Sequence, residues 1–345
     1  MTVALETTRR ADGDLVGVLE VRELTKHFPV RTTALKSAGK VHAADEVTFT
    51  LRPGAITALV GESGSGKSTV ARLLAKLYDP TSGQVLFEGK DIAKRGGRDA
   101  LLDYRSQVQM IFQDPFGSLN PVKTIRHHVA RPLLIHKIVP RSQVEERVHE
   151  LLRTVGLVPA EAVAQKYPHE LSGGQRQRVA IARALAVEPK VLLADEPISM
   201  LDVSIRLGIL NLMLKLKEER NLAFLYVTHD IASARYVADE MLVMYAGQIV
   251  ERGPTEEVLQ NALHPYTRLL LSAVPDPATG LHHQRIESHR GLAAAAVNPP
   301  DACRFVERCP LAVEVCSRVT PPLVEARPAH SARCHVTAPA PSVAG

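Results

Sequence analysis

The sequence predicts an α/β fold in which a mostly parallel, buried sheet carries a phosphate-binding loop. Three observations support this. Continuous apolar runs such as 191–194 and 223–227 end in polar residues, as strands covered on both faces do. A glycine-rich nonapeptide, Gly61 to Thr69, lies between one such run and a stretch of helical periodicity. A further region, about 115–185, has mainly helical signals and few strand signals.

Periodicity and turn residues give the elements in order. Residues 18–24 and 41–51 alternate apolar and polar side chains, which predicts half-buried antiparallel strands separated by a polar loop. The segment 93–98 is a basic loop. The remaining predicted elements are strands at 55–60, 84–88, 107–112, 191–194 and 223–227, a hairpin of 241–245 and 248–251, and helices at 70–77, 144–155, 176–186, 204–219, 256–260 and 265–272.

Composition limits the class of protein. The 345 residues suffice for one large domain or two, and 45% hydrophobic and 23% charged residues are ordinary for a globular chain. The net charge of +5 is mildly basic, but acidic and basic residues are interspersed, which favours a mixed solvated surface. We expect no transmembrane helix, a disordered leader over 1–17 that is no signal peptide, and a cytosolic protein.

The nonapeptide fits G-x-x-x-x-G-K-[ST], the P-loop pattern. Glycines let backbone N–H groups approach phosphate oxygens, and the helix that follows directs its N-terminal amides at the anion. Lys67 would reach the β- and γ-phosphates of a nucleoside triphosphate, and the Ser68 hydroxyl would bind Mg²⁺. The residues assigned to the nucleotide are Gly61, Ser63, Gly64, Gly66, Lys67, Ser68 and Thr69.

Three further motifs follow the P-loop. They are Leu171-Ser-Gly-Gly-Gln175, the strand end Val191-Leu-Leu-Ala-Asp-Glu-Pro197, and His229 after the next strand. In this order and spacing the set resembles the ATPase domain of ATP-binding cassette (ABC) transporters. The resemblance covers roughly 18–275. It implies a P-loop NTPase (RecA-like) core with an antiparallel β-subdomain and a helical subdomain at about 115–185.

The resemblance implies roles for individual residues. Asp195 would hold Mg²⁺ together with Ser68 and Gln113, and Glu196 would act as the general base for the attacking water. His229 matches the switch histidine that contacts the γ-phosphate, and Gln113 matches the Q-loop glutamine. Two residues complete the assignment: the D-loop aspartate Asp202, and Phe28, which falls where an aromatic ring stacks on adenine.

The signature pentapeptide implies a dimer. In the family, its residues contact the γ-phosphate held by the P-loop of a partner domain. These residues are Ser172, Gly173, Gly174 and Gln175. One chain has one P-loop and one signature, so we expect ATP to bind between two ATPase domains and hydrolysis to release them.

Several stretches resemble the oligopeptide/dipeptide importer subfamily: 112–121, 167–178 and 264–267. The start Lys26-His-Phe-Pro-Val30 resembles its second, F-type ATPase subunit. The implied partners are a homologous ATPase subunit in a heterodimer, two transmembrane permease subunits and an extracytoplasmic solute-binding protein. The chain would then lie peripherally at the cytoplasmic face of the membrane. Relatives with similar motifs import oligosaccharides, nickel or glutathione, so the solute stays open. Met200 departs from the Ala usual in the D-loop.

All four cysteines lie in the predicted C-terminal extension, 276–345, which we expect to be a small separate module. Clustered cysteines in a cytosolic chain favour a metal site over disulfides. The pattern Cys303-x5-Cys309-Pro-x5-Cys316-x17-Cys334 resembles the extension of peptide-importer ATPases, where four cysteines hold a [4Fe–4S] cluster. A tetrahedral Zn²⁺ site is the alternative, and free thiols are the third possibility.

Two other classes compete with the importer. A soluble ABC ATPase acting on nucleic acid or the ribosome generally has two cassettes or long coiled-coil insertions, and neither occurs in this sequence. We therefore expect no nucleic-acid partner. A regulatory cassette that does not hydrolyse ATP is disfavoured by the presence of Glu196 and His229.

Overall fold

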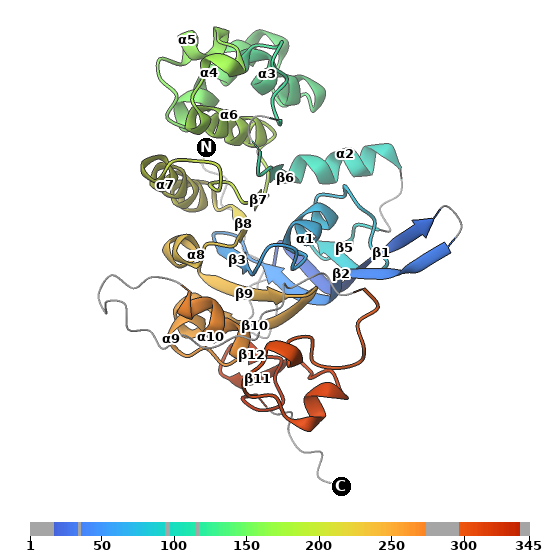
Figure 1. Cartoon of the computed structure of the whole chain (residues 1–345). Helices are drawn as coiled ribbons and strands as arrows, with labels where there is room; N and C mark the ends of the chain where they lie inside the picture. The colour runs from blue at the N-terminus through green and yellow to red at the C-terminus, as the bar shows by residue number, and fades with distance from the viewer. Residues whose placement is uncertain (1–16, 34–35, 94–96, 115–116, 274–296, 339–345) are drawn as a thin grey trace.

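A computed structural model describes residues 17–33, 36–93, 97–114, 117–273 and 297–338. Figure 1 shows three parts around a central sheet: an antiparallel sheet built mainly from the N-terminal strands, a group of helices set apart from the sheet, and the C-terminal residues at the opposite end. Residues 1–16 of the predicted leader (1–17) lie outside the described residues, as do 274–296 and 339–345.

The central sheet has eight strands in the order β11-β12-β10-β9-β3-β8-β7-β6. Its middle is parallel, with β3 (Ile56–Val60) between β8 (Ala223–Thr228) and β9 (Glu240–Tyr245), followed by β7 (Val191–Asp195) and β6 (Val108–Ile111). Strands β3, β7 and β8 are buried along their whole length. Successive side chains enter two separate cores, one on each face, which explains the unbroken apolar runs.

The second sheet is antiparallel, in the order β2-β1-β4-β5. Its first two strands, β1 (Leu19–Thr33) and β2 (Lys36–Leu51), form one long hairpin, so the predicted polar loop between 24 and 41 is wrong. Register shifts at five places break the two-residue alternation, and this conceals the strands from periodicity. The sheet is completed by β4 (Ser82–Phe87) and β5 (Lys90–Asp91).

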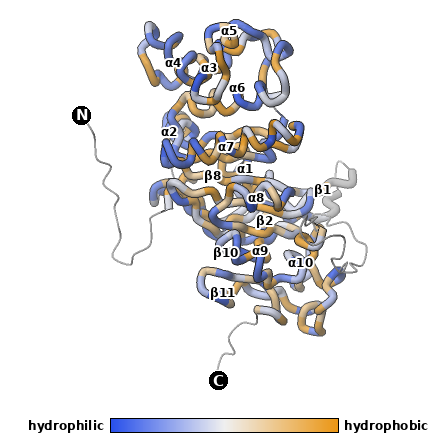
Figure 2. Tube along the Cα trace, turned by 90° about the vertical axis from the view of Figure 1, so that its left-hand side faces the viewer, coloured by the Kyte–Doolittle hydropathy of each residue, from blue (hydrophilic) through white to orange (hydrophobic). Residues whose placement is uncertain are grey.

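Helices cover the sheet and form the separate group. Helix α1 (Lys67–Leu74) follows the P-loop directly, and α2 (Arg98–Gln107) precedes β6 where no helix was predicted. The predicted helical region contains α3 (Ile125–Ile135), α4 (Val144–Thr154), α5 (Ala160–Gln165) and α6 (Gly173–Leu185). Helix α7 (Val203–Arg220) mixes apolar and polar positions along its length, as a helix with one buried face does (Figure 2). Helix α8 (Ile231–Val237) packs beside α7 and β3.

The C-terminal residues join the central sheet. After β10 (Gln248–Pro254) come α9 (Thr255–Gln260) and α10 (Pro265–Ser272). Strand β12 (His330–Ala332) then pairs antiparallel with β10 and with β11 (Val324–Arg327). The described part of the extension, 297–338, is therefore continuous with the ATPase-like sheet, whereas the sequence suggested a separate module. The predicted domain boundaries stay predictions.

In the part of the chain that the structure describes, no helix is both long and apolar enough to cross a membrane.

A buried carboxylate attaches β12 to β10. Glu251 is fully buried and accepts hydrogen bonds from the backbone N–H groups of Leu263 (2.7 Å) and His264 (2.8 Å) and from His330 Nε2 (2.7 Å). Removing its oxygens would leave three buried donors without acceptors.

We therefore expect Glu251→Ala to lower the free energy of unfolding by about 3–5 kcal/mol, the cost of breaking a buried pair. Urea unfolding followed by circular dichroism measures this. Glu218→Ala, at an exposed position on α7, is the matched control and should leave the midpoint unchanged. Equal midpoints for the two variants would contradict this role of Glu251.

Candidate functional site

The P-loop connects β3 to α1 and is held by close backbone contacts. A Cβ on Gly66, whose φ is +107°, would lie 1.9 Å from the Ala43 carbonyl oxygen of β2. Only glycine fits both the conformation and the space. The Ser65 carbonyl accepts a hydrogen bond from the Gly247 N–H at 2.9 Å. The loop is thus fixed between the two sheets.

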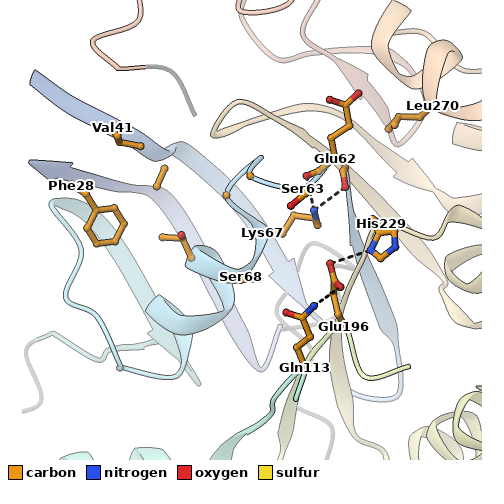
Figure 3. Close-up of a pocket in the computed structure, with 15 residues that line it drawn as sticks. Phe28, Val41, Glu62, Ser63, Lys67, Ser68, Gln113, Glu196, His229 and Leu270 are labelled. Atoms are coloured by element: carbon orange, nitrogen blue, oxygen red, sulfur yellow. Dashed lines mark hydrogen bonds and ion pairs between the residues drawn. The ribbon is translucent and has the colours of Figure 1, made fainter. Parts of the chain in front are cut away.

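A cavity of about 750 Å³ opens over this loop. Its size suits a nucleotide. It brings together predicted residues from five separate segments of the chain. Its predicted members are Phe28, Gly61, Ser63, Gly64, Gly66, Lys67, Ser68, Thr69, Gln113, Glu196 and His229. Figure 3 shows the side chains converging on it from the P-loop and the ends of the central strands.

Lys67 is a buried cation in this cavity. It is 4% exposed, and its Nζ donates to the carbonyl oxygens of Gly61 and Glu62, both at 2.8 Å. Burial lowers the pKa of Lys67, and the charges of Glu196, Asp195 and Glu62 oppose this. An ammonium held by backbone oxygens and poorly solvated is suited to bind a phosphate.

Ser68 and Asp195 form a site that fits Mg²⁺. The Ser68 hydroxyl donates to Asp195 Oδ1 at 2.8 Å, which places two oxygen ligands side by side at the start of α1 and the end of β7. Burial raises the pKa of Asp195, chiefly because its carboxylate is removed from water. A hard divalent cation bound to these oxygens would favour the ionised carboxylate.

Glu196 lies between Gln113 and His229 (Figure 3). Its Oε2 accepts from Gln113 Nε2 at 3.0 Å, and its Oε1 lies 3.1 Å from His229 Nδ1. The Glu196 backbone has φ +46°, in the left-handed region that non-glycine residues seldom occupy. The Glu196 N–H donates to the Val227 carbonyl at 2.9 Å, and its carbonyl accepts from Ser199, so neighbouring segments hold this conformation.

Phe28 lies at the opposite side of the cavity, on β1. Its half-buried ring contacts Tyr78 edge-on, with centroids 5.5 Å apart, and Val41 of β2 lines the cavity beside it. One face of a nucleotide base could stack on such a ring.

The signature residues and Asp202 are outside the cavity's lining. Ser172 begins α6 and forms a capping box with Gln175, in which each side chain accepts the other residue's backbone N–H. Asp202 begins α7. Three large apolar side chains near it are about half exposed or more: Met200, Val203 and Leu207.

The four cysteines form no disulfide with one another and lie close together near β12. Cys316 and Cys334 are buried, Cys303 and Cys309 are half-buried, and the Cys303 N–H donates to the Cys316 carbonyl at 2.8 Å. The pKa of Cys303 is raised to about 11, chiefly by burial and to a smaller degree by the other three cysteines. A metal would be needed to hold such thiols as thiolates.

Sequence reasoning missed three residues at the P-loop. The Glu62 N–H donates to the Tyr266 hydroxyl oxygen at 2.8 Å, and the Glu62 carboxylate accepts from Arg308. Tyr266 lies in the stretch 264–267 that resembled peptide importers, and Arg308 lies between two cysteines. Neither position carries a sequence signal that it returns to the P-loop.

Comparison with known proteins agrees with this geometry. Residues 44–199 match the ABC transporter family, and residues 250–316 match the C-terminal region of oligopeptide/dipeptide transporters. The chain is 44% identical to the oligopeptide transport ATP-binding protein AppF of Bacillus subtilis, covering 92% of this chain and 97% of AppF. It is also 44% identical to the di/tripeptide transport ATP-binding protein DppF of Pseudomonas aeruginosa, covering 89% and 94%.

Solved structures have the same fold. CbiO1 of Clostridium perfringens, part of an ABC transporter complex, superposes with a TM-score of 0.61 at 29% identity, covering 71% of this chain and 91% of CbiO1. The ATP-binding cassette MJ0796, solved as a dimer bound to ADP and phosphate, gives 0.60 at 30% identity, covering 69% and 98%. The chain therefore belongs to the ABC transporter family, as an ATP-binding protein with ATPase activity.

Proposed function

We propose that the chain is the ATP-binding subunit of an importer for di- or oligopeptides. One observation carries the proposal: relatives over nearly the whole length are peptide-transport proteins, and the likeness extends through the oligopeptide-transporter C-terminal region. Oligosaccharides, nickel and glutathione are the alternative solutes, since the ATP-site motifs do not contact the solute.

The cavity supports the following residue roles. Lys67 and the P-loop amides would bind the phosphates, and Phe28 would stack on the base. Ser68 and Asp195 would hold Mg²⁺, whose charge would stabilise the phosphates in the transition state. Glu196 accepts a proton from the attacking water. Gln113 and His229 already contact the two Glu196 oxygens, and this supports their role in orienting the carboxylate.

We further propose that ATP hydrolysis requires a dimer. The signature residues lie outside the cavity of their own chain, and the α6 N-terminus could supply amides to a phosphate on a partner. The exposed apolar side chains of Met200, Val203 and Leu207 beside Asp202 suit a protein contact. The partner would be a homologous ATPase subunit in a heterodimer.

A peptide importer also requires subunits that form the passage through the membrane, because this chain supplies the ATPase activity. We propose two permease subunits and an extracytoplasmic solute-binding protein, with this chain held peripherally on the cytoplasmic face.

Glu196→Gln tests the catalytic assignment. An amide cannot accept the proton, so we expect ATP turnover to fall about 10²–10⁴-fold while MgATP affinity stays within about threefold. Phosphate release and equilibrium nucleotide binding measure the two quantities. Glu218→Gln on α7 makes the same chemical change at an exposed site and should retain wild-type turnover. Equal turnover in both variants would refute the role of Glu196.

The solute assignment has a separate test. The complex is isolated by an affinity tag on this chain, and its co-purifying binding protein is titrated with peptides, oligosaccharides, glutathione and Ni²⁺. We expect peptides to bind and to stimulate ATP hydrolysis in reconstituted vesicles. Binding of another solute class, with no peptide response, would exclude peptide import and leave the ATPase assignment intact.

We propose in addition that Cys303, Cys309, Cys316 and Cys334 hold a [4Fe–4S] cluster. Among the described residues, three candidate metal-ligand atoms lie within 4.8 Å of one another at one place, His27, His42 and Asp45. No three of the cysteine sulfurs are therefore that close to one another. A tetrahedral zinc site, with Zn–S near 2.3 Å, would bring its sulfurs to about 3.8 Å. Burial lowers the pKa of Arg333, and Cys303 is among the weaker influences that raise it, so this guanidinium lies in the neighbourhood of a thiol.

Metal analysis of anaerobically purified chain tests this proposal. We expect about four iron atoms per chain and a broad visible absorption band, both lost in Cys316→Ser. Stoichiometric zinc without iron would show that the cysteines hold zinc and would refute the cluster. Absence of both metals would refute a metal centre.

A further inference from the structure

Glu62 places a carboxylate next to the phosphate-binding loop. Its backbone carbonyl receives the Lys67 ammonium, and it lines the cavity. Because Glu62 belongs to the loop and lines the same cavity as Lys67, an unpaired carboxylate at this position would repel a triphosphate.

Arg308 neutralises this carboxylate. Its Nη1 and Nη2 donate to Glu62 Oε2 and Oε1 at 3.0 and 2.9 Å, a two-point contact that fixes direction as well as distance. The Arg308 side chain is 12% exposed, and its guanidinium lies 5.7 Å from the ring centroids of both Tyr245 and Phe305. The Arg308 guanidinium is thus largely shielded from solvent by these rings.

We propose that Arg308 is a positioning residue for ATP binding, which neutralises Glu62 and holds its carboxylate away from the triphosphate. Figure 3 shows the Glu62 side chain extending away from Lys67, while its backbone stays in the loop. The Tyr266 hydroxyl fixes that backbone through the Glu62 N–H. The P-loop thereby keeps its geometry, and the negative charge of Glu62 is not presented to the nucleotide.

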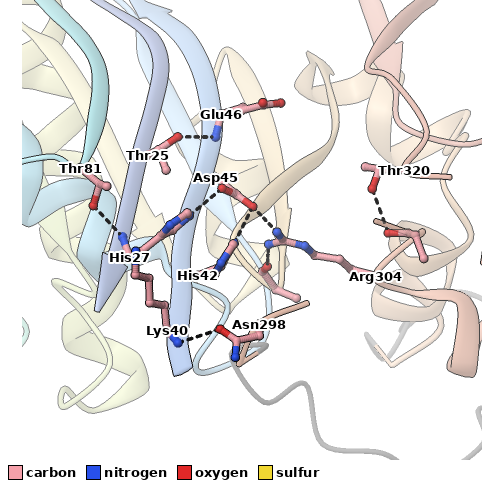
Figure 4. Close-up of polar contacts among 12 residues, drawn as sticks. Thr25, His27, Lys40, His42, Asp45, Glu46, Thr81, Asn298, Arg304 and Thr320 are labelled. Atoms are coloured by element: carbon pink, nitrogen blue, oxygen red, sulfur yellow. Dashed lines mark hydrogen bonds and ion pairs between the residues drawn. The ribbon is translucent and has the colours of Figure 1, made fainter. Parts of the chain in front are cut away.

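The segment that contains Arg308 is also connected to the P-loop through a second arginine, Arg304. Arg304 donates to the Asp45 carboxylate and to the Ala246 carbonyl (Figure 4). Asp45 binds the Gly247 carbonyl through its N–H at 2.8 Å, and Gly247 in turn binds Ser65 of the loop. Both arginines lie between Cys303 and Cys309, in a segment of seven residues. The segment between Cys303 and Cys309 is therefore connected to the P-loop at two residues, Glu62 and Ser65.

A four-variant comparison in the full-length chain tests the role of Arg308. We expect Arg308→Ala to weaken MgATP binding about tenfold, because Glu62 becomes an unpaired anion. At saturating ATP, kcat in the assembled complex should stay within about twofold, so KM carries the effect. Arg308→Lys retains the charge without the two-point contact, so its MgATP affinity should lie between those of wild type and Arg308→Ala. Arg318→Ala, an exposed arginine of the same extension paired with Glu314, is the control and should match wild type.

Rescue separates this role from a purely structural one. Adding Glu62→Gln to Arg308→Ala removes the repelling charge and should restore MgATP affinity to within about threefold of wild type. Unchanged affinity in Arg308→Ala would overturn the proposal. Weakened affinity without rescue, accompanied by a lowered Tm, would also overturn it, because Arg308 would then only support the fold.

The connection to the cysteines rests on the proposed metal centre. Cys309→Ser should weaken MgATP binding to the same degree as Arg308→Ala, and the double variant should be no weaker than either one. Iron content is measured on the same samples. If Cys309→Ser loses the metal but keeps wild-type affinity, the connection is refuted while Arg308 retains its role. If wild-type chain has no metal, the metal proposal alone fails.

Discussion

The structure depends on keeping one ammonium, that of Lys67, buried among backbone oxygens. A buried cation is costly unless it is paired, and among the described residues no carboxylate forms a direct hydrogen bond with Lys67 Nζ. The carbonyls of Gly61 and Glu62 compensate in part, and this requires the loop to curl tightly around the side chain. An incoming triphosphate can complete the compensation, which is why such a site favours an anion with several charges.

That curled loop is supported by both sheets and by the C-terminal extension. A Cβ on Gly61 would lie 2.2 Å from the Met244 carbonyl of β9, and Gly66 meets Ala43 of β2 equally closely. The β9–β10 turn binds Ser65, and the extension binds Glu62. Because both sheets and the C-terminal residues contact the loop, a change in packing of any of them would alter the phosphate site. The antiparallel sheet and the extension are thus part of the ATP site's construction.

Sequence reasoning recovered the elements whose signals are local. The helix predicted at 144–155 and the strand predicted at 191–194 match α4 and β7 closely. Helix α4 buries one face and β7 is buried along its whole length, and each arrangement produces a regular pattern of apolar residues. The long β1–β2 hairpin was missed since its bulges shift the alternation, and α2 was missed because its sequence is strongly polar. In the candidate site, residues fixed by short motifs were found. The contact between Glu62 and Arg308 joins positions 246 apart, and no local pattern encodes it.

The three carboxylates around the cavity differ in their partners in a way that fits their proposed roles. Asp195 has the Ser68 hydroxyl, a neutral donor that leaves the carboxylate available to a metal ion. Glu196 contacts Gln113 and His229, which orient it without a permanent strong cation and so leave it able to accept a proton. Glu62 is the one of the three whose oxygens both accept hydrogen bonds from an arginine in the described structure, whereas Arg72 acts on Asp195 only through its charge. An arginine bound directly to both oxygens would block metal binding or proton transfer, and it is found at the carboxylate that neither step would use.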